Sequence, residues 1–174
     1  MKAILTLAIL LSITIPSFAR LGETEAQSTA RYGASLHSYP CPSSKCKELD
    51  FWKDGIFISE CFIEDKCCEM SVRKAPSADF AYANPKGDTS VPPLNLEEAK
   101  VLLNQNAEGH QWVTAQTFPT DCTAAWDRDD GGTAGIIGGS LLLQNPDWKL
   151  FIGENGKAMR AARERAAQKS LNGM

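Results

Sequence analysis

The feature that most constrains the fold of this chain is an outline that occurs twice: a capped helix, a loop, and then strand-like segments. Residues 24–27 (Thr-Glu-Ala-Gln) form a capping box, in which the Thr and Gln side chains each satisfy a backbone donor of the first helical turn. Gly33 is suited to end this helix, because glycine enters the left-handed conformation at little cost. A second box, residues 95–98 (Asn-Leu-Glu-Glu), begins a helix that ends before Gly109. The apolar face of this second helix is formed by Leu96, Ala99, Leu102 and Leu103.

A β-hairpin is predicted after the first helix, beyond a Ser-, Pro- and Cys-rich loop at residues 34–50. Within residues 51–73, the segment 56–63 is rich in β-branched and aromatic residues. Residues 68–73 alternate apolar with polar side chains, as a half-buried strand does. We place the turn between these strands at Glu64-Asp65.

Short strands are predicted after the second helix as well, over residues 111–118, 124–128, 134–137 and 140–144. Asp130-Gly131 and Gly138-Gly139 are typical hairpin turns. Four tryptophans are most simply core residues of the sheet: Trp52, Trp112, Trp126 and Trp148.

The two halves, residues 20–73 and 94–150, are separated by a Pro-containing loop at residues 74–93. We therefore expect one α+β domain over residues 20–156, with a twisted antiparallel sheet covered on one side by two helices. The shared outline suggests a repeated helix-and-strands unit.

The C-terminal segment, residues 157–174, is expected to form a peripheral Ala-rich helix from about 157 to 171. Its charges are Lys157, Arg160, Arg163, Arg165 and Lys169 against Glu164 alone. A basic helix beside an acidic body is compatible with anionic lipid or nucleic acid, but its alanine face is too thin for firm interfacial insertion. The net charge of −3 for the whole chain also argues against a nucleic-acid partner. A solvated helix folded against its own domain is the favoured interpretation.

The first nineteen residues are typical of a secretory signal peptide. Lys2 is followed by an apolar run at residues 3–15, Pro16 ends the run, and Ser17 and Ala19 offer small residues to a peptidase. A membrane anchor is the alternative, but this run is shorter than the roughly 20 residues of a spanning helix. The sequence therefore predicts cleavage after Ala19 and a secreted or periplasmic protein that begins at Arg20.

Six cysteines follow the predicted cleavage site: Cys41, Cys46, Cys61, Cys67, Cys68 and Cys122. In an oxidising compartment an even number favours disulfides. Zinc is the alternative, but the spacings are irregular and the chain holds only two histidines. We therefore treat all six as disulfide candidates and expect no metal.

The turn at residues 64–65 predicts how the cysteines pair. It places Cys61 opposite Cys68, while Cys67 points to the other face of the sheet, because neighbouring residues in a strand alternate. Cys41 and Cys46 are close enough in sequence to bridge a small loop. Cys67 is then left to meet Cys122 from the other half.

Nothing in the sequence identifies a catalytic residue. A Ser-His-Asp or Cys-His site needs a histidine base, and neither His37 nor His110 has a recognisable nucleophile motif nearby. Glu97-Glu98 is explained by the favourable charge at a helix N-terminus.

The sequence contains no motif that predicts a bound cofactor or metal. Residues 127–131 (Asp-Arg-Asp-Asp-Gly) resemble a calcium loop, but the glycine stands at position 5 instead of 6, which favours a hairpin turn. Residues 153–157 lack the spacing and the Ser or Thr of a phosphate-binding loop.

Several segments resemble a group of uncharacterised secreted bacterial proteins. They are residues 21–27 (Leu-Gly-Glu-Thr-Glu-Ala-Gln), residues 30–33 (Ala-Arg-Tyr-Gly), the capped helix through Leu102-Leu103, Trp112, and residues 126–131. More distantly, the chain is similar to the SmpA/OmlA lipoproteins and to the β-lactamase-inhibitor-protein fold. The resemblance implies a helix-plus-antiparallel-sheet unit that binds proteins. Two departures are the absence of a lipid-attachment cysteine after the apolar run and an extra Cys-rich loop at 41–46.

Taken together, these features predict an exported, non-enzymatic protein that binds another protein or associates with the cell envelope. The open face of the sheet or the loop at residues 74–93 would form the contact surface. The alternative is a small secreted hydrolase, or an inhibitor of one.

Overall fold

The computed structural model describes residues 20–40, 46–83, 90–117, 119–151 and 153. The predicted signal peptide at residues 1–19, Cys41 and the predicted helix at 157–171 lie outside the described residues.

Both predicted capping boxes are present and begin the two main helices. Thr24 caps α1 (Glu25–Tyr32), and Gly33 follows it with a φ of 91°. Asn95 caps α3 (Leu96–Gln105), and Gly109 lies beyond its end with a φ of 88°. A further helix, α2 (Ala78–Ala83), lies within the segment that we expected to be a loop.

The first half contributes a four-stranded meander: β1 (His37–Pro40), β2 (Cys46–Lys53), β3 (Ile56–Ile63) and β4 (Lys66–Lys74). The predicted turn at Glu64-Asp65 is confirmed, and both residues adopt positive φ, as the tight turn requires. The prediction of a loop at residues 34–50 is wrong, because β1 and most of β2 lie there. Asp54-Gly55 forms the turn that connects β2 to β3.

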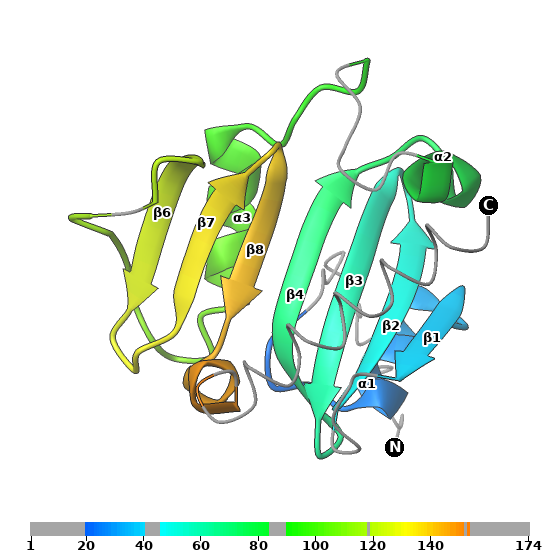
Figure 1. The fold of residues 1–174 in the computed structure, drawn as a ribbon, viewed down its shortest axis with the longest axis horizontal. Coiled ribbons are helices and arrows are strands. Elements are labelled where there is room, and N and C mark those ends of the chain that lie inside the picture. Colours follow the sequence, from blue (N-terminus) through cyan, green and yellow to red (C-terminus); the bar gives the residue numbers. More distant parts are fainter. Residues whose placement is uncertain (1–19, 41–45, 84–89, 118, 152, 154–174) are drawn as a thin grey trace, which may run out of the picture.

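The second half contributes β5 (Trp112–Thr114), β6 (Cys122–Arg128), β7 (Thr133–Ile137) and β8 (Ser140–Gln144). All strands form one antiparallel sheet in the order β1-β2-β3-β4-β8-β7-β6-β5. The two meanders therefore meet where β4 pairs with β8, as Figure 1 shows. The predicted α+β class and its antiparallel sheet with two packing helices are confirmed.

The main core lies between one face of the sheet, here called the inner face, and the helices α1 and α3, which lie behind the sheet in Figure 1. Its largest fully buried apolar members are Leu21, Leu49, Phe51, Ile58, Met70, Leu141 and Leu143. Trp126 joins this core as predicted, whereas Trp112 and Trp52 are only partly buried.

The opposite face, here called the outer face, carries two smaller clusters over the first half. Phe57 packs with Ala75 and with Ala81 of α2. Residues 146–151 are helical, orange in Figure 1, and place Trp148 and Phe151 against three cysteines. Trp148 is thus buried, but outside the sheet.

Candidate functional site

The pairing of β3 with β4 around the cysteines differs from the predicted register by one residue. Ile63 faces Lys66 and Phe62 faces Cys67, as expected, but a bulge shifts the next pair so that Cys61 faces Glu69. Cys68 is the extra residue of this bulge, because two residues on a bulged strand oppose one on its partner. The predicted opposition of Cys61 and Cys68 is therefore wrong.

Three cysteines nevertheless gather on the outer face, where Cys46, Cys61 and Cys68 pack against Trp148 and Phe151. The Sγ atoms of Cys46 and Cys61 lie 2.9 Å apart, so this pair stands near disulfide distance. Cys46 takes part in a disulfide. The Cys41–Cys46 bridge that we predicted involves a residue outside the described ones.

Cys67 and Cys122 do not meet, contrary to prediction. Cys67 belongs to the inner core and is fully buried. Strands β8 and β7 lie between its strand and that of Cys122. Three strand spacings of roughly 4.8 Å place the two backbones roughly 14 Å apart, well beyond the roughly 6.8 Å that a disulfide tolerates.

A hollow of about 220 Å³ lies over β6, β7 and β8, and we call it the outer hollow. Cys122 and Gly135 are neighbours in its lining, since a Cβ built on Gly135 would stand 3.2 Å from the Cys122 Sγ. The outer hollow is lined mainly by small or apolar side chains: Ala115, Thr117, Pro119, Ala125, Ile137 and Leu142. Asp127, Thr133 and Gln144 add polar groups to its lining.

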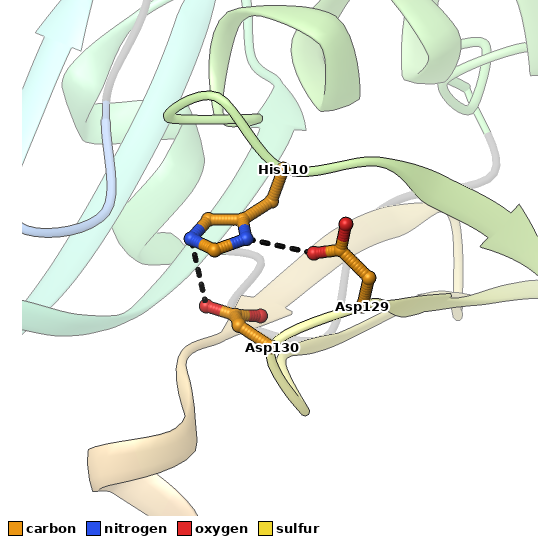
Figure 2. Close-up of side chains that lie close together, drawn as sticks. All are labelled: His110, Asp129 and Asp130. Atoms are coloured by element: carbon orange, nitrogen blue, oxygen red, sulfur yellow. Dashed lines mark hydrogen bonds and ion pairs between the residues drawn. The ribbon is translucent and has the colours of Figure 1, made fainter.

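His110 lies in a second cluster with Asp129 and Asp130, shown in Figure 2. Its Nδ1 lies 2.7 Å from the Asp129 Oδ1, and its Nε2 lies 3.8 Å from the Asp130 Oδ2. A general base needs a ring nitrogen directed at the proton that it removes. Both ring nitrogens face carboxylates, so the His110 ring, which comes from the segment between α3 and β5, is held against the turn between β6 and β7.

A metal would compete with Arg128 for this cluster. The Arg128 Nε and Nη2 donate to the two carboxylate oxygens of Asp130 at 2.8 and 2.7 Å, and this ion pair lowers the pKa of Asp130. Those oxygens are the ligand atoms that a cation would need, and the guanidinium repels it. The ion-pair network therefore accounts for the cluster, and Gly131 takes the positive φ of the predicted turn.

His37 also has a structural environment. Its ring makes an edge contact with Tyr82 at 4.5 Å between centroids and stacks on Tyr39 at 5.9 Å. Tyr82 in turn donates its hydroxyl to Asp50. His37 thus joins β1 to α2.

Among the described residues, four acidic or basic ones are buried although the sequence analysis did not identify them: Asp50, Glu60, Arg73 and Arg128. Glu60 is fully buried on the inner face between Ile58 and Phe62, and burial raises its pKa to about 7. The signal that identifies it is its position, because a residue that alternates with two apolar side chains in a strand shares their buried face. The Ser28 hydroxyl only partly offsets the effect of burial on this pKa.

Comparison with known proteins places the chain in no family: no family model and no curated protein matches the sequence. The structure is distantly similar to the crystal structure of a cysteine-rich secretory protein from Staphylococcus aureus, with a TM-score of 0.44 and 8% identity. The match covers 74% of this chain and 45% of that protein, so the chain spans less than half of its length. Within the described residues, no helix is both long and apolar enough to cross a membrane.

Proposed function

We propose that this protein is an exported, non-enzymatic binding protein, and that the outer hollow receives an apolar side chain of a partner polypeptide. The observation that carries the proposal is the hollow itself, a concave and mainly apolar site over β6, β7 and β8. Export is supported by the apolar run at residues 3–15 and the small residues before Arg20.

The size of the outer hollow favours a side chain over a free small molecule. Pockets for drug-sized ligands commonly enclose roughly 300–1,000 Å³, which is more than the 220 Å³ present here. One large apolar side chain fills such a volume, and anchoring by a few such side chains is how protein interfaces obtain most of their affinity. Val113 on the neighbouring edge strand is 57% exposed and extends the apolar surface.

The chemistry of the hollow supports binding over hydrolysis. Cys122 is the cysteine in the lining of the outer hollow that could serve as a nucleophile. Burial, together with the nearby Asp121, raises the pKa of its thiol. A nucleophilic cysteine needs the opposite shift, because the thiolate is the reactive form. Both histidines lie elsewhere, so the outer hollow offers no histidine base to the hydrolase alternative, whereas an inhibitor remains a form of binding protein.

The test is selection of peptides from a displayed random library on purified wild-type protein. Ile137→Lys places a charge in the hollow, and Leu150→Lys, at a side chain that is 68% exposed, is the matched control. Peptides with a bulky apolar residue should bind the wild type and the control equally. Their affinity should fall at least tenfold on Ile137→Lys. Peptides that bind all three proteins equally would overturn the assignment.

A further inference from the structure

A set of buried polar atoms lies between α1 and the sheet. Within the part of the chain that the structure describes, neither carboxylate oxygen of Glu60 makes a hydrogen bond of good geometry, and nor do the hydroxyls of Ser28 and Tyr32, although the Ser28 hydroxyl lies close enough to lower the pKa of Glu60. Ser28 and Tyr32 come from α1, and Glu60 comes from β3. Native proteins pair nearly all such groups, so this group needs a physical account.

The charge state of Glu60 decides how costly this arrangement is. A neutral carboxyl can be buried at moderate cost, but an ionised one without a partner is far more expensive. The pKa of Glu60 is raised from 4.5 to about 7, mainly by burial and to a smaller extent by the nearby Glu23, while the Ser28 hydroxyl and Arg31 lower it. Arg31 is itself paired with Glu23, so it offers Glu60 little net charge.

The remaining titratable groups around Glu60 do not stabilise its ionised form. Tyr32 on α1 and Cys67 on β4 both have their pKa raised, first by burial and next by Glu60. Lys47 of β2 is held by Glu25 at 2.6 Å. A charge on Glu60 can therefore reach water only if α1 moves away.

The attachments of α1 and the chain before it lie outside the strand pairings of the eight-stranded sheet. The Leu21 N–H donates to the Asn106 Oδ1, the Glu25 N–H donates to the Asp65 Oδ1, and the Lys53 Nζ donates to the Arg31 carbonyl. The chain before α1 pairs with β4, where Gly22 N–H donates to the Cys67 carbonyl and Cys67 N–H donates to the Glu23 carbonyl. The Tyr32 ring contacts Phe51 at 5.3 Å between centroids. These contacts can separate while the eight-stranded sheet stays paired.

We propose that α1 is a proton-sensitive clasp, which lies docked on the sheet while Glu60 is neutral and undocks locally when Glu60 ionises. The proton leaves to solvent, the carboxylate becomes hydrated, and Cys67, whose backbone pairs with the chain just before α1, becomes accessible. This inference is independent of the outer hollow, which lies on the opposite face of the sheet.

Native-state amide hydrogen exchange at pH 5 and pH 8 tests the clasp. With the pKa of Glu60 moving from about 7 docked to 4.5 exposed, the opening constant of the α1 amides should rise roughly 70-fold beyond the change in intrinsic exchange chemistry. Amides of β7 and β8 should show no such rise. Glu60→Gln should remove the pH dependence, and Glu97→Gln on the exposed face of α3 should retain it.

Alkylation of Cys67, read by peptide mass spectrometry, is the second measurement and uses the wild-type chain alone. Its rate, relative to that of the unfolded protein at the same pH, should rise in step with exchange in α1. Equal pH dependence of α1 and of β7 and β8 would mean global unfolding and would overturn the clasp. A pH-independent α1, or the same pH dependence in Glu60→Gln, would overturn it as well.

Discussion

Arg128 provides a sharp test of how the second half is held together. Its side chain is 2% exposed. Besides the paired bonds to Asp130, its Nη1 donates to the Asn106 carbonyl at 2.8 Å, and its guanidinium lies 5.3 Å from the centre of the Trp112 ring. Asn106 in turn accepts the Leu21 N–H. One side chain thus links the β6–β7 turn to the end of α3 and, through it, to the N-terminal segment.

Arg128→Leu should cost about 2–4 kcal/mol in free energy of unfolding, somewhat less than the roughly 3–5 kcal/mol found when one partner of a fully buried ion pair is removed, because the Asp130 side chain is 20% exposed. The loss comes from the Asp130 carboxylate, which loses both bonds from Arg128 and keeps the Gly132 N–H as a donor, and from the Asn106 carbonyl, which loses its bond from Arg128. For a protein of this size, each kcal/mol lowers the melting temperature by roughly 2–4 °C, so a fall of about 10 °C is expected. Urea unfolding followed by circular dichroism measures the change directly.

The control is Lys100→Met, which removes an exposed pair with Glu97 and should cost less than about 1 kcal/mol. Because Arg128 lowers the pKa of Asp130, the stabilisation from this pair is present above the ordinary Asp pKa and is lost as the pH falls through the folded value. The gap between wild type and Arg128→Leu should therefore narrow below a pH of about 4. An Arg128→Leu loss no larger than that of Lys100→Met would refute the reasoning.

Three further outcomes follow from the structure. Asn95→Ala removes the cap of α3 and should lower the free energy of unfolding by about 1 kcal/mol in a urea titration; no change would mean that the cap is redundant. Cys46→Ser should lower the melting temperature more than Cys122→Ser, because Cys46 is disulfide-bonded and Cys122 is a thiol; the reverse order would restore the long-range bridge. N-terminal sequencing of exported material should begin within two residues of Arg20, and a start further along would contradict the predicted cleavage.

Local signals in the sequence were sufficient to predict an element where the residues that form the signal have few other structural roles. The capping boxes at Thr24 and Asn95 are of this kind, because a hydroxyl or amide three residues before a Glu or Gln has few other roles. The turn at Glu64-Asp65 was found from the strands on either side of it. The bulge at Cys68 was not, since an extra residue leaves no mark in an alternating pattern.

Tertiary partners decided the features that sequence could not reveal. β2 contains Lys47, Glu48 and Asp50, and from sequence such a charged run resembles a polar loop. In the structure Lys47 donates to Glu25, and the Ser59 hydroxyl donates to Glu48. The role of Arg128 depends on the Asn106 carbonyl, a backbone group from another element that no motif encodes. The pairing of β3 with β4 that was predicted from the turn alone is shifted by one residue beyond Phe62. The predicted opposition of Cys61 and Cys68 is wrong for that reason.

The two meanders share their element order but differ in what covers the outer face, and this difference argues for the place of the binding surface. In the first half, α2 lies over Phe57, and residues 146–151 lie over Cys46, Cys61 and Cys68. In the second half, the lining of the outer hollow is instead made small by Ala125 and Gly135, which leaves space that a larger side chain would fill. The outer face is thus covered by packed side chains over the first half and hollow over the second half. The contacts that stabilise the fold are therefore separate from the surface proposed to bind a partner. A partner that docks on β6, β7 and β8 then leaves the cysteine cluster undisturbed.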